Sequence, residues 1–225
     1  MQEFNCRTKI ISGENALDWL SHLRCESLMV VTDPYFMENG WAEKIARRVQ
    51  AQKRIFFDRV KPDPTVELAA EGTALLRQAK PQILIALGGG SAMDTAKAMR
   101  HFAAEENTFI AIPTTSGSGS EVTDFAILTH GDVKHPLVDK HLQPDVAILA
   151  KELVEELPPA LIADGGFDVD LLLHIGDLAS PALDRLLVVG LDAAVELIHT
   201  GRDVQCAVQI VTGQAVVGRG KGTVA

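Results

Sequence analysis

The pattern that most constrains the fold is an alternation of short apolar runs with amphipathic stretches between residues 27 and 150. The apolar runs have the length and the branched aliphatic content of strands buried on both faces. Strands that alternate with helices predict a parallel sheet with helices packed against it. The expected strands are SLMVVT ending at Thr32, KRIFF ending at Phe57, ILIALG ending at Gly88, TFIAIP ending at Pro113 and DVAIL ending at Leu149.

The stretches between these strands repeat apolar residues at helical spacing, which predicts amphipathic helices. Thr65 follows Pro62, Asp63 and Pro64, and we expect it to cap one of these helices. Ahead of residue 27, the run FNCRTKII and the apolar residues after it predict a small strand and a helix. The stripes are Trp41, Ile45 and Val49; then Leu68, Leu75, Leu76 and Ala79; then Ala92, Ala96, Met99 and Ala103.

Composition and charge exclude several classes of protein. The chain has 225 residues, of which 47% are hydrophobic and 23% are charged, so we exclude a disordered, collagen-like or coiled-coil chain. Its formal net charge is −9 and it has no basic stripe, so we expect no nucleic-acid partner. Three cysteines without metal-ligand spacing, and no apolar run of signal-peptide or membrane-spanning character, predict a cytoplasmic protein with no membrane partner.

A glycine-rich turn follows the strand that ends at Gly88, within ILIALGGGSAMDTAKA at residues 83–98. Glycines let backbone N–H groups approach an anion, and the helix that follows directs the positive end of its dipole at it. The G-x-G-x-x-G dinucleotide fingerprint is incomplete because Met93 stands at the third glycine position. The run therefore predicts a phosphate site, although any tight strand-to-helix turn could contain these glycines.

Two more segments end neighbouring strands of the expected sheet. The run IPTTSGSGSEVTDF, residues 112–125, offers many hydroxyl donors, which suit a nucleotide and would equally suit a solvated loop. Asp33 ends the run VVTDP, where a carboxylate would accept from ribose hydroxyls and repel a 2′-phosphate, or only cap the next turn. Open α/β sheets bind ligands at the carboxyl ends of their strands, so together these segments predict a nucleotide cleft that prefers NAD to NADP.

The segments GGGSAMDTAKA, IPTTSGSGSEVTDFAI, KHPLVDKHLQPDVAIL and LPPALIADGGFDV resemble, in this order and spacing, the iron-containing (group III) alcohol dehydrogenases. The likeness is greatest to the ethanolamine- and propanediol-utilisation branch and covers residues 1 to about 169. It implies a dehydroquinate synthase-like α/β domain at residues 1–157 and a mostly helical metal-binding domain after it. Residues 158–225 would then be a truncated or divergent start of that helical domain.

The resemblance also implies an activity and a set of contacts. The family transfers hydride between a nicotinamide and a short alcohol or aldehyde at a divalent metal, here expected to be Fe²⁺ or Zn²⁺. It forms dimers through the N-terminal strand, so a homodimer is expected. By motif, Gly89, Gly90 and Ser91 would hold the pyrophosphate with Asp94 close by; Asp33 would select NAD; Thr114, Thr115 and Ser118 would line the adenine and ribose side; Thr123 and Phe125 would lie near the nicotinamide half; and Lys134 near the ribose.

The family's metal ligands are an aspartate, a histidine four residues later and two further histidines downstream. Asp168 matches the aspartate, but Leu172 stands where the first histidine belongs. Asp170 and His174 have the Asp-x-x-x-His spacing, which places both on one helix face. Asp168, Asp170 and His174 are therefore the candidate ligands, although such a pair in an aliphatic stretch is often incidental.

Three interpretations stay open on the sequence alone. The first is an NAD-dependent alcohol dehydrogenase, for which no catalytic residue can be assigned. The second is a dinucleotide-binding remnant without catalysis, or an assembly partner of a longer dehydrogenase. The third is a structural protein whose glycine and Ser/Thr runs are only turns. The loss of resemblance after Val169 indicates either a shifted reading frame or a natural short variant.

Overall fold

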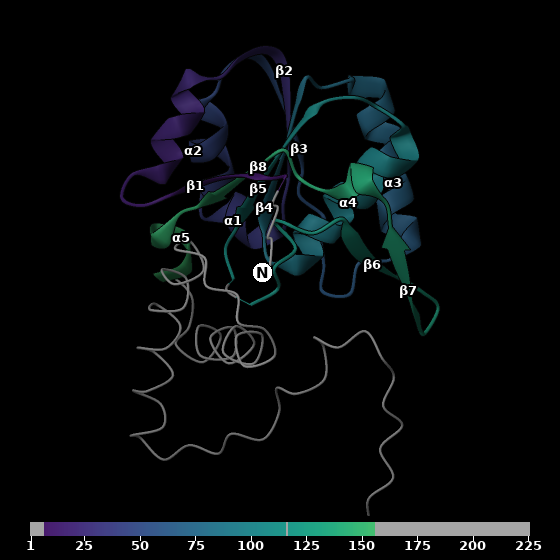
Figure 1. The fold of residues 1–225 in the computed structure, drawn as a ribbon. Coiled ribbons are helices and arrows are strands. Elements are labelled where there is room, and N and C mark those ends of the chain that lie inside the picture. Colours follow the sequence, from purple (N-terminus) through teal and green to yellow (C-terminus); the bar gives the residue numbers. More distant parts are fainter. Residues whose placement is uncertain (1–6, 116, 156–225) are drawn as a thin grey trace, which may run out of the picture.

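The computed structural model describes residues 7–115 and 117–155, and in these ranges a six-stranded parallel sheet lies between two layers of helices (Figure 1). The strand order is β1-β8-β5-β4-β2-β3, and every neighbouring pair is parallel. This confirms the predicted parallel α/β fold. The strands are Lys9–Ser12 (β1), Arg24–Val31 (β2), Gln50–Phe57 (β3), Ile83–Gly88 (β4), Thr108–Pro113 (β5) and Val146–Leu149 (β8).

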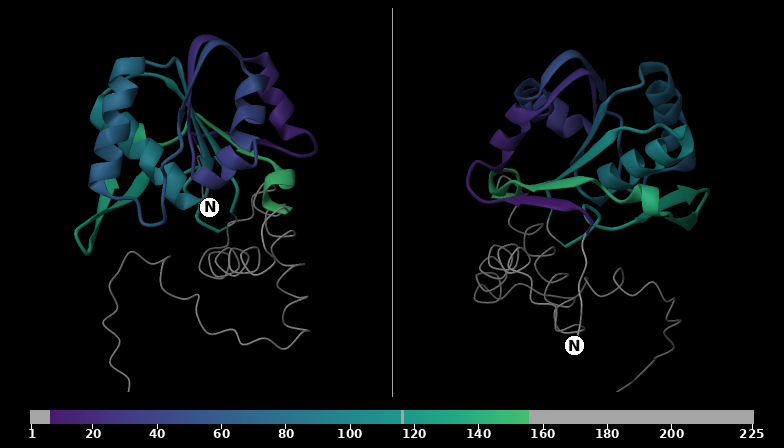
Figure 2. Two further views of the ribbon diagram at one scale, coloured as in Figure 1. Left: turned by 180° about the vertical axis from the view of Figure 1, so that it is seen from behind. Right: turned by 45° about the horizontal axis from the view of Figure 1, so that its top comes forward.

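Helices cover both faces of this sheet, as the two views in Figure 2 also show. Successive side chains of β2 alternate between the faces: Leu28 and Val30 join one buried cluster, and Met29 and Val31 join the other. One face packs against η1 (Ala16–His22), α1 (Pro34–Glu38), α2 (Trp41–Arg48) and α5 (Lys151–Glu155), and the other packs against α3 (Val66–Ala79) and α4 (Gly90–Ala103).

The sheet has its topological switch point between the neighbouring strands β2 and β4. The chain leaves β2 for α1, whose Phe36 is buried on one face, and leaves β4 for α4, whose Met93 is buried on the other. The two connections therefore diverge at the carboxyl ends of adjacent strands, which is where open α/β sheets form a ligand crevice. The glycine turn and Asp33 both lie in these connections.

Most element boundaries agree with the sequence pattern, and three features do not. β4 and β5 have the predicted bounds, and Thr65 caps α3 by accepting from the Leu68 N–H at 3.2 Å. The helix expected near the N-terminus is a 3-10 helix. The short α1 and an antiparallel hairpin of β6 (Phe125–His130) and β7 (Val133–Val138) were not predicted.

The sequence did not predict the hairpin, because only one of its two strands, β6, alternates buried and less buried residues. Its Ala126 and Leu128 are buried, and Leu128 packs with Ala69 of α3 and Ala98 of α4. β7 is almost entirely exposed and contains Pro136, which an edge strand tolerates. The last short element is the 3-10 turn η2 (Lys140–Leu142).

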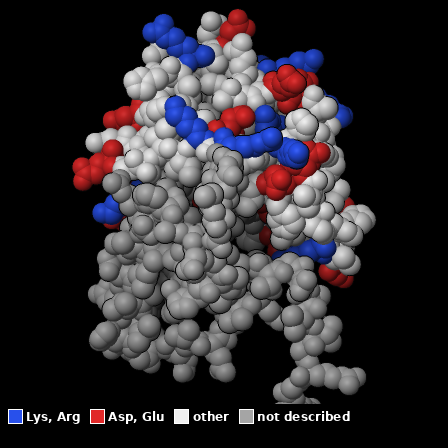
Figure 3. All heavy atoms as spheres, viewed as in Figure 1, with Lys and Arg blue, Asp and Glu red and all other residues white. Residues whose placement is uncertain are grey.

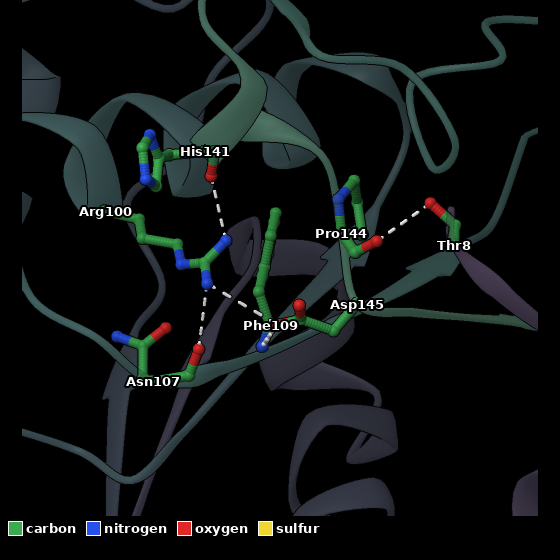
Figure 4. A network of polar contacts seen from close by, with 7 residues as sticks. All are labelled: Thr8, Arg100, Asn107, Phe109, His141, Pro144 and Asp145. Carbon is green, nitrogen blue, oxygen red and sulfur yellow. Dashed lines mark hydrogen bonds and ion pairs between the residues drawn. The ribbon is translucent and has the colours of Figure 1, made fainter. Parts of the chain in front are cut away.

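A polar network fastens the C-terminal half of α4 to the sheet (Figure 4). The Arg100 guanidinium donates to the backbone carbonyls of Asn107 at 3.0 Å and His141 at 2.8 Å, and it pairs with Asp145 at 3.5 Å. The Asp145 carboxylate accepts from the Phe109 N–H at 2.8 Å. Arg100 thus joins α4 to the starts of β5 and β8, at the edge of the sheet opposite the glycine turn.

Charges of both signs are mixed over the described part of the face in Figure 3. Exposed ion pairs in the described ranges include Arg47 with Glu43 and Arg59 with Glu71. Exposed pairs of this kind contribute little to stability. Among the helices of the described ranges, none has the length and apolar content to span a bilayer.

Candidate dinucleotide-binding site

The turn after β4 requires glycine at position 88. Gly88 has φ +146°, a conformation that side chains disfavour, and a Cβ there would lie 2.7 Å from the Ala92 Cβ. The same Cβ position is 3.7 Å from Asp33 Oδ2. The turn can therefore adopt this conformation only because position 88 has no side chain. The Asp33 carboxylate lies next to that position.

The N-terminus of α4 presents backbone donors at this turn. Its N-cap, Gly89, has no side chain to cap the helix, and its carbonyl accepts from the N–H groups of Ala92 at 3.0 Å and Met93 at 3.2 Å. Within residues 7–115 and 117–155, no hydrogen bond engages the N–H of Gly90 or Ser91. Unpaired donors at the start of a 14-residue helix suit an anion such as a pyrophosphate.

The segment between β5 and β6, called the Ser/Thr loop from here on, packs onto the glycine turn. It begins directly after β5, the neighbour of β4 in the sheet. The Thr114 N–H donates to the Gly88 carbonyl at 3.0 Å. Thr115 Oγ1 lies 3.1 Å from the position that a Cβ of Gly89 would occupy, and Ser118 Cβ lies 3.5 Å from that of Gly90. The structure thus brings Thr114, Thr115 and Ser118 together with the glycines, as the sequence predicted for one cleft.

Asp33 caps the helix that follows it, which was the alternative interpretation from the sequence. Its Oδ1 accepts from the Phe36 N–H at 3.2 Å, and Oδ2 is the oxygen nearest the glycine turn. Partial burial raises the pKa of the Asp33 carboxyl, against the lowering effect of the backbone N–H groups of Phe36 and Tyr35. Asp33 therefore caps α1 through Oδ1 and places Oδ2 next to the glycine turn.

Asp94 is partly buried and ties α4 to the Ser/Thr loop. Its Oδ1 accepts from Ser120 Oγ at 2.9 Å, and its Oδ2 accepts from the Ile127 N–H at 3.0 Å. Burial raises the pKa of Asp94, while these two donors and the Lys97 charge oppose that rise. Both carboxylate oxygens are therefore engaged by the protein itself.

Lys97 is a fully buried cation one helical turn after Asp94. Its Nζ donates to Ser120 Oγ at 3.0 Å, to Thr123 Oγ1 at 3.1 Å and to the Phe125 carbonyl at 2.7 Å. Burial lowers its pKa to about 8, although the charges of Asp94, Glu121 and Asp124 favour the ammonium form. Lys97 and Asp94 together hold the loop between β5 and β6 on α4.

The sequence analysis did not single out Lys97, and it treated Ser120 only as one of the hydroxyl donors of residues 112–125. The signal for Lys97 was a lysine between Ala96 and Ala98, three residues after Asp94 and so on the same helical face. Glu121 was missed as well. It is 8% exposed, burial raises its pKa, and in the part of the chain that the structure describes its Oε2 has no hydrogen-bond partner.

The remaining candidates lie elsewhere or outside the described residues. Lys134 is exposed on β7 and pairs with Asp63 Oδ1 at 2.6 Å, and no contact joins it to the glycine turn among the described residues. Phe125 is 38% exposed, and its carbonyl rather than its ring joins the Lys97 cluster. Asp168, Asp170 and His174 lie outside the described residues, within which no group of three or more His, Cys, Asp or Glu side chains could hold a metal.

This arrangement can be compared with known proteins. The family model described as iron-containing alcohol dehydrogenase matches residues 7–151. The chain belongs to this family. The match confirms the resemblance seen in the sequence motifs.

Relatives in this family differ in their named activity and cofactor. The 1-propanol dehydrogenase PduQ of Citrobacter freundii is 38% identical over 196 residues, which cover 83% of this chain and 53% of that protein. The NADPH-dependent butanol dehydrogenase of Clostridium saccharobutylicum is 33% identical, with 88% and 57% covered. The chain therefore spans about half the length of these relatives.

Solved structures of the family share the fold. Sulfoacetaldehyde reductase from Bifidobacterium kashiwanohense, in complex with NAD⁺, has a TM-score of 0.68 at 27% identity, covering 75% of this chain and 51% of that one. The iron-containing alcohol dehydrogenase from Thermococcus thioreducens has a TM-score of 0.65 at 31% identity, covering 74% and 51%. Both likenesses support the family assignment.

Proposed function

We propose that this chain binds NAD(H) and supplies the dinucleotide domain of an alcohol dehydrogenase that interconverts a short alcohol and its aldehyde. The observation that carries the proposal is the meeting of three segments at the carboxyl ends of β2, β4 and β5. Gly88 lies beside the Asp33 carboxylate, and Gly89, the N-cap of α4, lies beside the Thr115 hydroxyl group. A dinucleotide needs this combination of a phosphate cradle and a ribose acceptor.

Each group of residues has a separate task in this proposal. Gly89, Gly90 and Ser91 bind the pyrophosphate through backbone N–H groups, and Ser91 adds a hydroxyl donor. Oδ2 of Asp33, the oxygen next to the glycine turn, accepts from the adenosine ribose and disfavours a 2′-phosphate, so NAD is preferred to NADP. Thr114, Thr115 and Ser118 supply the adjoining polar wall.

The rest of the reaction follows from the family. When bound, the nicotinamide accepts or donates hydride and a divalent metal such as Fe²⁺ or Zn²⁺ polarises the alcohol oxygen. The fit of the described residues extends to the dinucleotide only, because the candidate metal ligands Asp168, Asp170 and His174 fall outside them. The metal part of the proposal therefore rests on family membership.

Calorimetric titration of the full chain with NADH and NADPH tests the binding step. We expect NADH to bind, and NADPH to bind at least tenfold more weakly, a difference of about 1.4 kcal/mol. One relative is named for NADPH, so both dinucleotides are compared. Tighter binding of NADPH than of NADH would overturn the role assigned to Asp33. Absence of binding by either dinucleotide would overturn the proposed function and favour a purely structural protein.

Oxidation of NADH by propanal, followed with added Fe²⁺ or Zn²⁺ and with chelator-treated protein as the control, tests the catalytic step. Metal-stimulated turnover would support the alcohol dehydrogenase proposal. Binding without turnover would favour the alternative of a dinucleotide-binding module or an assembly partner of a longer dehydrogenase.

A further inference from the structure

The Lys97 ammonium group is matched to three acceptors that all belong to the segment between β5 and β6. An ammonium has three N–H donors, and here each has one acceptor: Ser120 Oγ, Thr123 Oγ1 and the Phe125 carbonyl. The distances are 3.0, 3.1 and 2.7 Å. Lys97 Nζ, from α4, thus binds three residues that lie within six positions of one another.

The same loop forms one wall of the candidate dinucleotide site. It begins at Thr114, which bonds to Gly88, and passes Thr115 and Ser118, which contact the glycine positions. It ends at Phe125, where β6 starts. Gly117 and Gly119 in this loop have positive φ angles, and neither has a side chain that could pack against the protein. Lys97 and Asp94 hold one end of the loop and the Gly88 turn holds the other. Two further bonds reach the same loop: Gln143 Nε2 donates to the Val122 carbonyl at 3.1 Å, and the Asp139 N–H donates to the Asp124 carbonyl at 3.1 Å.

We infer that Lys97 is a positioning residue for the dinucleotide site: its ammonium group holds residues 120–125 on α4, and this fixes the Ser/Thr wall against the glycine turn. The inference rests on the proposed function for its consequence, which is dinucleotide affinity. Lys97 itself is 0% exposed, so it acts through the loop and contacts no ligand.

The charges around Lys97 require a cation at this point. Among the described residues, the charged groups that act on it are Asp94 on α4, and Glu121 and Asp124 on the loop. The neighbouring β6 faces the cluster with the Phe125 carbonyl and the Ile127 N–H, which Asp94 binds. Removal of the ammonium would leave the hydroxyls of Ser120 and Thr123 and the Phe125 carbonyl without their donor. It would also leave the buried Glu121 carboxylate without its nearby positive charge, which costs more than the hydrogen bonds themselves contribute.

The protonation state of Lys97 gives the loop a measurable pH response. A neutral amine has two N–H donors for three acceptors, so one anchor of the loop is lost. Because the pKa of Lys97 is about 8, we expect NADH affinity to fall as the pH rises from 7 to 9. A lysine that merely filled space in the core would give no such midpoint.

The test compares the full chain with Lys97→Met and Lys97→Arg, and uses Lys53→Met, an exposed lysine on β3, as the matched control. Calorimetric titration with NADH should give control affinity within twofold of wild type and a loss on the order of tenfold for Lys97→Met. The pH response should disappear in both variants. Lys97→Met should have low affinity at every pH. Lys97→Arg should have an affinity nearer to wild type, because its guanidinium stays charged over the whole range.

Amide hydrogen exchange of residues 117–128 provides a readout that does not depend on the dinucleotide. Faster exchange there in Lys97→Met, with unchanged exchange in β4, supports the anchoring role. NADH affinity and exchange like those of Lys53→Met would overturn the inference while the proposed function stands. If the wild-type chain binds no dinucleotide, the proposed function fails, and the exchange comparison alone then decides whether Lys97 anchors the loop.

Discussion

At the scale of single residues, two positions connect the sequence directly to the candidate site. Gly88 has both a φ of +146° and a neighbour too close to allow a Cβ. Asp33 caps α1 through Oδ1 and places Oδ2 next to the glycine turn. The glycine requirement was readable from the run of three glycines after a buried strand. The dual role of Asp33 was not, because capping and ribose recognition favour the same residue type.

Serine at position 33 separates the two roles of Asp33. Asp33→Ser keeps an oxygen that can accept from the Phe36 N–H, so its stability should stay near that of wild type. Asp33→Ala removes the cap and should lose about 1 kcal/mol of unfolding free energy. Both variants lack the charge, so both should bind NADPH more tightly relative to NADH than wild type does. Urea unfolding and paired titrations measure the two effects, and an unchanged dinucleotide ratio in both would remove Asp33 from the recognition site.

Alanine at position 88 should destabilise the chain more than alanine at another positive-φ glycine. Gly40 has φ +81° and nothing within 4 Å of the position that a Cβ would occupy, so Gly40→Ala reports conformational strain alone. At Gly88 the Cβ also meets Ala92 at 2.7 Å, and this overpacking should add a cost of about 1–3 kcal/mol. Urea unfolding of both variants checks the order. Equal losses would show that the turn relaxes without cost.

At the scale of elements, α4 is the support on which the site is built. Asp94 and Lys97 join its middle to the Ser/Thr loop, and Arg100 joins its C-terminal end to β5 and β8 (Figure 4). The strand before α4 and the strand after it were predicted with their observed bounds, because both are continuous apolar runs. The loop anchors were not predictable, since they join residues separated by 23 to 33 positions through side chains that the sequence pattern treats as solvent-facing.

Replacement of Arg100 should loosen the far end of α4 without affecting the site. Its side chain is 14% exposed and has three partners, so Arg100→Met should lower the free energy of unfolding by about 1–3 kcal/mol. Arg59→Met, which breaks an exposed pair with Glu71, should lose less than about 1 kcal/mol. NADH affinity should change less than twofold in both. A large loss of affinity in Arg100→Met would show that the two ends of α4 are coupled.

At the scale of the whole molecule, the order of strands places the glycine turn, Asp33 and the Ser/Thr loop at one edge of the sheet. The alternation of strands and helices predicted the parallel sheet, and with it the meeting of these segments. The β6–β7 hairpin was not predictable, because β7 buries almost nothing and so has no apolar periodicity. Its packing on α3 and α4 depends on tertiary contacts that only the folded chain supplies.

The buried ammonium of Lys97 also affects the stability of the whole chain, and with the opposite sign from its effect on the site. Its pKa is about 8 when folded, below the usual value of 10.5, so between these values the unfolded chain binds the proton that the folded chain has lost. Unfolding free energy must then rise with pH across this window, by about 3 kcal/mol for a shift of this size. Comparison of wild type with Lys97→Met isolates this contribution, because every other titrating group is common to both. Urea unfolding should show wild type gaining on Lys97→Met from pH 8 to 10, while its NADH affinity falls over the lower part of the same range. A constant difference between the two chains would mean that the ammonium keeps its ordinary pKa in the folded protein.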